Sequence, residues 1–76
     1  MSTPLPLSRV PTGSRCRITS VEATIRGDLG REGLLPGTEV AVIARTPLGG
    51  PLVVEVGRAR IALSCAVAAG VATEVP

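Results

Sequence analysis

A chain of 76 residues is long enough for one domain with a thin core, because a chain this short hides only about 60–65% of its unfolded surface. Its hydrophobic content is 45% without any Phe, Tyr or Trp, so the core must be aliphatic, and the aromatic surfaces that stack single-stranded bases or grip polyproline ligands are absent. The net charge of +2, with all basic residues arginine, is too small for the footprint of a nucleic-acid-binding domain.

The first predicted elements are an extended segment and a strand. Pro4 and Pro6 disfavour regular structure, so residues 1–8 are predicted to be an extended lead-in. Residues 14–22 then alternate between apolar and polar side chains, which is typical of a half-buried strand. The alternation breaks towards the end of this strand, so we expect a bulge or sharp bend near Ser20.

A short helix is predicted over residues 24–33. Its interior glycines weaken it, because each costs roughly 1 kcal/mol relative to alanine. We therefore expect a poor helix that ends at Gly33 and is held by the docking of Leu29 and Leu34 rather than by helix propensity.

Short strands joined by tight turns fill the rest of the chain. Pro36 and Gly37 predict a type II turn, because proline fixes φ at the second position and glycine offers a positive φ at the third. The elements that follow are a strand at 38–46, a loop at 47–51, a strand at 52–56, a type II′ turn at 57–58, a strand at 59–64, a helical turn at 65–69 capped by Ser64, and a closing strand at 71–75. Five short strands, with a helix between the first two and a helical turn before the last, predict a mainly all-β fold, a small and strongly bent barrel.

The sequence lacks the residue sets that catalysis or a metal site would need. It has no histidine, and its six carboxylates are scattered through different predicted elements, so no base is placed beside a nucleophile. We expect no enzyme activity and no cofactor. The two weak metal-ligand candidates are Cys16 and Cys65; Cys16 falls on the core face of its strand, which favours a buried small side chain, and no dedicated metal site is predicted.

Two exposed features are candidates for partner binding. The first is the charged face of the predicted helix, which suits an interface rim, with Leu29 or Leu35 supplying apolar contact. This candidate comprises Arg26, Asp28, Leu29, Arg31, Glu32 and Leu35. The second is Leu48, which is either part of a flexible hairpin tip or an apolar knob that docks on a partner. Open strand edges also allow main-chain pairing, hence a weak homodimer.

Three blocks of sequence, in this order, resemble the ferrous iron transport protein A (FeoA) family. The strongest block is residues 29–42, LGREGLLPGTEVAV, with the signature Gly-Leu-x-Pro-Gly at 33–37. The two further blocks are the loop at 47–51 with the strand after it, and the segment 61–71. The resemblance covers about residues 5–75.

The resemblance implies an SH3-like barrel, similar to the carboxy-terminal domains of iron-dependent repressors. It also implies a small cytoplasmic accessory protein of bacterial ferrous iron uptake, which binds and modulates the membrane permease that carries a cytosolic GTPase domain. The alternative is a metal-responsive regulatory module like the repressor barrel. The chain departs from the family pattern at Glu32, Leu35, the 57–58 turn and the 64–69 segment.

Nothing in the sequence predicts export or a membrane anchor. No stretch approaches the ~20 apolar residues that cross a bilayer, and the first residues lack the basic and apolar regions of a signal peptide. We therefore expect a single domain over residues 1–76 in the reducing cytoplasm, without membrane insertion and without a nucleic-acid partner.

Overall fold

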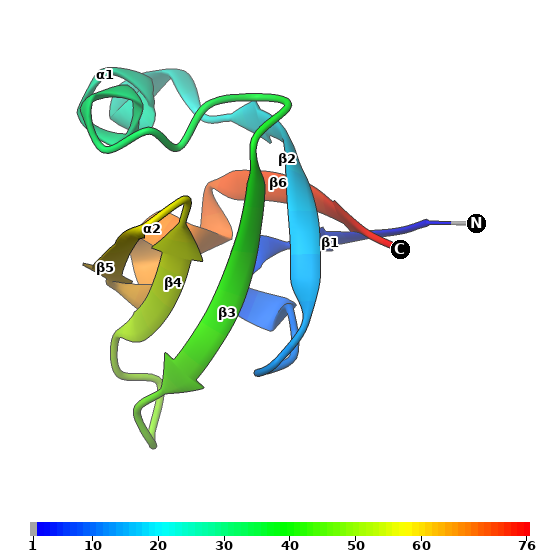
Figure 1. Cartoon of the computed structure of the whole chain (residues 1–76). Helices are drawn as coiled ribbons and strands as arrows, with labels where there is room; N and C mark the ends of the chain where they lie inside the picture. The colour runs from blue at the N-terminus through cyan, green and yellow to red at the C-terminus, as the bar shows by residue number, and fades with distance from the viewer. Residues whose placement is uncertain (1) are drawn as a thin grey trace.

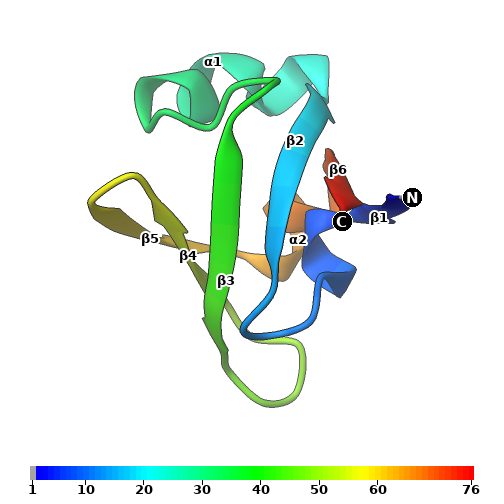
Figure 2. The ribbon, with the colours of Figure 1, turned by 45° about the vertical axis from the view of Figure 1, so that its right-hand side comes forward.

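The computed structural model describes residues 2–76, which form one antiparallel sheet and three short helices. In chain order the elements are β1 (Thr3–Pro6), the 3₁₀ helix η1 (Leu7–Arg9), β2 (Arg15–Val21), α1 (Ala23–Arg31), β3 (Glu39–Arg45), β4 (Leu52–Val56), β5 (Ala59–Leu63), α2 (Cys65–Ala69) and β6 (Val71–Val75). The strands lie in the order β1-β6-β2-β3-β4-β5, and the sheet curls so that α1 sits across one end (Figures 1 and 2). The predicted mainly β architecture is confirmed.

The predicted lead-in is a strand, so the sheet has six strands within residues 2–76 instead of five. β1 pairs antiparallel with β6 at one edge of the sheet. An edge strand tolerates Pro4 and Pro6, because a proline whose nitrogen faces away from the ladder removes none of its hydrogen bonds. Thr73 Oγ1 adds a bond to this edge by donating to the Leu5 carbonyl at 2.7 Å.

The predicted irregularity in the strand after the lead-in is confirmed. The pairing of β2 with β6 shifts in register between Ile18 and Ser20. Because of this shift, Ile18 and Val21 both point into the core although they are three positions apart, an odd spacing that would put them on opposite faces of a regular strand.

The end of α1 is also as predicted. Gly33 has a φ of +89°, and the N–H groups of Gly33 and Leu34 donate to the carbonyls of Gly30 and Leu29 at 3.1 and 2.9 Å. These two bonds form a Schellman motif, which reverses the chain behind the helix. Leu29 and Leu34 are both buried, so leucine docking does hold this helix.

Two further turns match their predicted types. The Thr38 N–H donates to the Leu35 carbonyl at 3.0 Å, and Gly37 between them has a φ of +91°, as a type II turn requires. Gly57 has a φ of +59° and is followed by a residue without positive φ, which fits the type II′ turn between β4 and β5.

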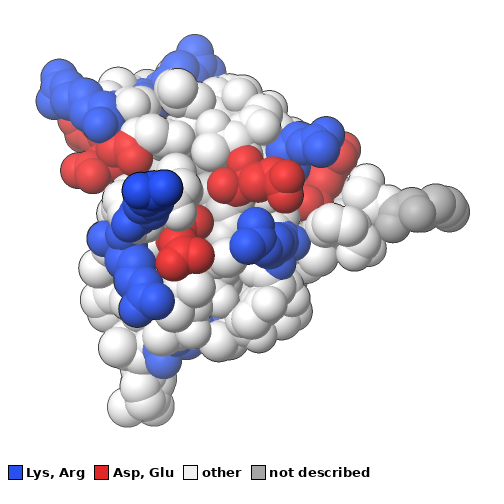
Figure 3. Space-filling view, viewed as in Figure 1, with Lys and Arg blue, Asp and Glu red and all other residues white. Residues whose placement is uncertain are grey.

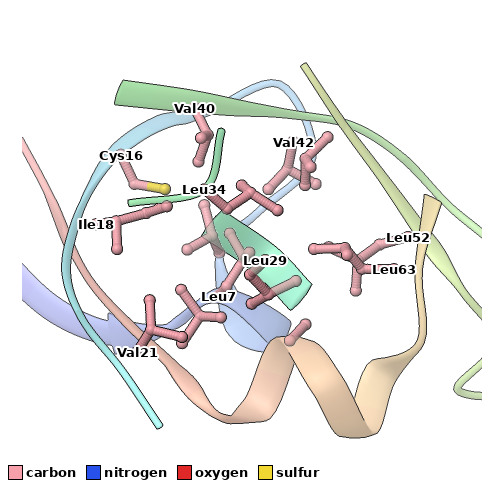
Figure 4. Close-up of a cluster of buried hydrophobic side chains, with 14 residues drawn as sticks. Leu7, Cys16, Ile18, Val21, Leu29, Leu34, Val40, Val42, Leu52 and Leu63 are labelled. Carbon is pink, nitrogen blue, oxygen red and sulfur yellow. The ribbon is translucent and has the colours of Figure 1, made fainter. Parts of the chain in front are cut away.

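The core is aliphatic, and both the sheet and the three helices contribute side chains to it (Figure 4). Its buried members are Leu7, Val10, Cys16, Ile18, Val21, Leu29, Leu34, Val40, Val42, Leu52, Val54, Leu63, Ala68 and Val71. Helix α2 contributes one residue and is capped as predicted, since Ser64 Oγ accepts from the Val67 N–H at 3.1 Å.

Candidate partner surfaces

The solvent face of α1 carries the first candidate surface. Asp28 and Arg31 form an ion pair of 3.5 Å across one turn, and their side chains are 81% and 82% exposed. Glu32 follows at the exposed end of the helix. An ion pair this exposed adds little to stability, so these charges are free to serve recognition.

Leu35 supplies the apolar part of this surface. It is 47% exposed and lies over Gly30, where an added Cβ would be 3.4 Å from Leu35 Cδ2. Leu35 therefore packs against the helix at Gly30. We call Asp28, Arg31, Glu32 and Leu35 the α1 surface.

Two residues predicted for this surface face elsewhere. Leu29 is only 4% exposed and belongs to the core, so of the two leucines offered for the apolar contact only Leu35 is exposed. Its place in the Schellman motif accounts for the burial, because a hydrophobic contact between the residues at the positions of Leu29 and Leu34 commonly accompanies this motif. Arg26 turns back towards the sheet, where Nη2 donates to the Val21 carbonyl at 3.2 Å.

Arg26 instead lines a shallow groove of about 830 Å³ between the β1–β6 edge and the start of α1. Glu22 and Glu74 line the same groove, so its walls carry both signs of charge. The sequence interpretation missed this groove because one of its walls is β1, which was expected to be irregular. The only sequence signal for that wall was the alternation of leucine and proline in residues 4–7.

Leu48 lies in the loop between β3 and β4, which forms the second candidate surface at the end of the molecule opposite α1 (Figures 1 and 2). It is fully exposed and has a φ of +62°. The loop is closed at its base, where the N–H and Oγ1 of Thr46 both donate to the Pro51 carbonyl, at 3.0 and 2.7 Å. The predicted exposure of Leu48 is confirmed, and the structure does not bring it together with the α1 surface.

The outer face of the sheet mixes charges instead of forming a basic stripe (Figure 3). Arg17 is paired in register with Glu39 on one side and Glu74 on the other. Arg60 lies opposite Glu55, with Nε and Oε2 3.6 Å apart. Alternation of this kind leaves no extended field that would attract a polyanion.

The two cysteines occupy different environments. Cys16 is buried in the core as predicted, and burial raises the pKa of its thiol, an effect that a hydrogen bond with Thr73 partly offsets. Cys65 is half-buried on α2, and both thiols are free. Within residues 2–76 no three His, Cys, Asp or Glu side chains gather in a group that would hold a metal ion.

The curled six-stranded sheet, its aliphatic core and its short helices define a small SH3-like β-barrel. A crystal structure of an FeoA described as an iron uptake regulatory protein has a TM-score of 0.87 and 27% identity, covering 97% of this chain and 99% of the other. The zinc-complexed FeoA of Stenotrophomonas maltophilia, described as a procaryotic SH3 domain protein, is 34% identical with a TM-score of 0.73, covering 93% of this chain and 86% of its own. T. acidophilum IdeR shares the fold at 18% identity and a TM-score of 0.82, over 96% of this chain and 34% of its own.

The FeoA domain family matches residues 5–75, and the chain belongs to the FeoA family. Membership implies an accessory role in ferrous iron transport, in a family that is not known for enzymes. The comparison with curated proteins finds no match. Among residues 2–76, no helix has the length and apolar character needed to span a bilayer.

Proposed function

We propose that this protein is a non-enzymatic, cytoplasmic accessory protein of ferrous iron uptake that binds the cytosolic part of a membrane iron permease through its α1 surface. The observation that carries the proposal is Leu35, a large apolar side chain that is 47% exposed beside the charges of α1. An apolar centre with a charged rim is the usual anatomy of a protein–protein interface.

The backbone beneath this surface is well fixed. The Schellman motif anchors one end of the segment, and the type II turn through Gly37 anchors the other. Buried Leu34 holds the chain down between them. Because the backbone is already ordered, binding a partner would lose little conformational entropy here.

The mechanism would be a shift of population in the partner. A protein that binds one conformation of the permease more tightly than another raises the fraction of the first conformation. This role requires a binding surface and no reactive group, which agrees with an aliphatic interior and charges that lie on the surface.

A binding experiment with one surface variant tests the proposal. The purified cytosolic GTPase domain of the permease is titrated with this protein, with and without guanine nucleotide. We expect Leu35→Glu to weaken binding by about tenfold or more, as for an apolar residue central to an interface. Thr12→Glu is the matched control, because it adds the same charge at an exposed site before β2, at the end of that strand away from α1.

The Leu48 loop is tested separately. We propose it as a second contact, reached only by a partner large enough to span both ends of the molecule. Leu48→Glu would then weaken binding by a factor that multiplies with that of Leu35→Glu, because distant sites contribute independently. Equal affinity of Leu48→Glu and wild type would restrict the interface to the α1 surface.

A further inference from the structure

The last strand of the sheet has an open edge. The strand order ends at β5, and β5 pairs only with β4, in unbroken register from Leu52↔Leu63 to Val56↔Ala59. None of the backbone hydrogen bonds that residues 2–76 make outside their helices and strands involves Ala59–Leu63. In Figures 1 and 2, β5 also lies apart from β1, so the barrel is not closed by pairing between them.

The turn geometry tells which groups of β5 face outward. In a two-residue hairpin the closing pair, here Val56 and Ala59, exchanges hydrogen bonds, and such pairs recur at every second residue. Ala59, Ile61 and Leu63 therefore bond to β4. Arg60 and Ala62 direct their N–H and C=O groups to the open side.

Three of the usual protections of an edge strand, namely proline, a bulge and an inward-pointing charge, are missing from β5. Proteins block exposed edges with proline, a bulge, an inward-pointing charge or a covering segment. The opposite edge, β1, contains Pro4 and Pro6. β5 contains no proline, its register with β4 is continuous, and its one charged side chain, Arg60, lies on the outer face beside Glu55.

We propose that the edge of β5 binds an extended acidic segment of another protein as an added antiparallel strand. Main-chain bonds to Arg60 and Ala62 would supply affinity, and alternate side chains would supply specificity. The side chain of Arg60 is 67% exposed and Arg58 is exposed in the turn, so carboxylates on the outer face of the added strand would be favoured. On the inner face, half-buried Ile61 favours an apolar neighbour.

Charge also argues against a second copy of this chain as the occupant. Antiparallel pairing of two β5 strands about Ile61 would place both Arg60 side chains on one face, in diagonal positions roughly 7–8 Å apart, with the Arg58 turns beyond them. An acidic strand would meet these arginines with opposite charge instead. The inference does not depend on the permease, because the edge of β5 and the α1 surface are different sites.

The test uses a short blocked peptide in which valine alternates with glutamate, and its counterpart with lysine in place of glutamate. With the full chain labelled with nitrogen-15, we expect the glutamate peptide to slow amide hydrogen exchange at Arg60 and Ala62 by about tenfold or more at saturation. We also expect it to bind about tenfold more tightly than the lysine peptide at low salt. Equal binding of the two peptides, no binding, or protection confined to other residues would overturn the proposal.

Two pairs of variants separate main-chain pairing from charge. Ala62→Pro removes an outward N–H that β4 does not use, so the chain should fold while peptide binding falls about tenfold. Ala62→Ser keeps the N–H and should bind normally.

The second pair of variants tests charge. Arg60→Glu should reverse the preference between the peptides, whereas Arg15→Glu, on a central strand, should not. If Ala62→Pro fails to fold by circular dichroism, Arg60→Glu decides, and an unchanged preference overturns the proposal. Dimerisation of the free protein that Ala62→Pro abolishes would also overturn it, because the occupant would then be a second copy.

Discussion

Leu48 combines a φ of +62° with a fully exposed side chain. The left-handed region costs a residue with a Cβ roughly 1–2 kcal/mol, and no burial of the side chain offsets that cost here. Strain of this kind persists where the surrounding loop imposes it, and it often accompanies a functional contact. The closed base of the loop, fixed by Thr46 and Pro51, imposes it in this protein.

We predict that Leu48→Asn leaves stability unchanged or raises it by up to about 1 kcal/mol, because asparagine tolerates the left-handed region better than leucine. Urea unfolding followed by far-UV circular dichroism measures the effect. A loss of stability would mean that Leu48 makes a stabilising contact that the exposed side chain does not reveal.

The buried thiol of Cys16 makes stability depend on pH. Burial raises the pKa of this thiol, so it ionises less readily in the folded state than in the unfolded chain. Its contribution to stability is therefore fully present at neutral pH and is lost as the pH rises through and above about 8.5, the pH at which the unfolded thiol is half ionised.

We predict that the free energy of unfolding falls between neutral pH and pH 10 under reducing conditions, and that Cys16→Ala removes this part of the fall. Cys65→Ala serves as the comparison, since Cys65 is only half-buried. An identical pH profile for wild type and Cys16→Ala would show that the fall arises from other groups.

At the scale of elements, α1 is a weak helix held in place by its ends. Two of its nine residues are glycines, Gly27 and Gly30, and Gly33 follows just beyond its C-terminus, but the three serve different purposes. Gly33 needs its φ of +89°, whereas an added Cβ at Gly30 would meet only the end of the Leu35 side chain, at 3.4 Å, and one at Gly27 would meet no atom within 4 Å. Gly27 is therefore the glycine whose replacement is least constrained.

We predict that Gly27→Ala stabilises the protein by roughly 0.5–1 kcal/mol, because alanine has the higher helix propensity and restricts the unfolded chain. Gly33→Ala should destabilise it by roughly 1–2 kcal/mol through left-handed strain. Parallel urea titrations compare the two variants. Equal effects of the two substitutions would contradict this account of α1.

Helix α2 depends on its cap. It has five residues, too few to be stable alone, and Ser64 Oγ satisfies the Val67 N–H at its start.

We predict that Ser64→Ala lowers the free energy of unfolding by about 1 kcal/mol, and that Ser64→Asp, which also accepts this bond, restores most of it. Thermal and urea unfolding measure both. A neutral Ser64→Ala would show that packing of Ala68, which is fully buried, is sufficient to hold the helix.

For the whole molecule, the sequence predicts best where the signals are local. Gly33, Gly37 and Gly57 predict turns whose geometry depends on a few adjacent residues, and the structure contains each turn. β1 escaped prediction because two prolines oppose strand formation locally, while its partner β6 lies at the other end of the chain. The strand conformation of this segment therefore depends on its pairing with β6 and not on local sequence preference.

For the candidate partner surfaces too, the local sequence predicts some features, whereas others depend on the tertiary structure. The exposure of Leu48 follows from its loop, and the exposure of the charged residues of α1 follows from their polarity. The choice between Leu29 and Leu35 does not follow from spacing, because the Schellman motif buries Leu29, whereas Leu35 follows the motif and packs on the outside of the helix at Gly30. The separation of α1 from the Leu48 loop could not be predicted from the sequence, because it depends on how the strands between them assemble into the sheet.

The most direct test of the account maps the amide signals of this protein while the cytosolic GTPase domain of the iron permease is added in each nucleotide state. If the α1 surface binds this domain, the signals of residues 28–35 should shift or broaden in at least one state, and Leu35→Glu should abolish the change whereas Thr12→Glu should not. The absence of any change in every nucleotide state, or changes that leave residues 28–35 untouched, would contradict it.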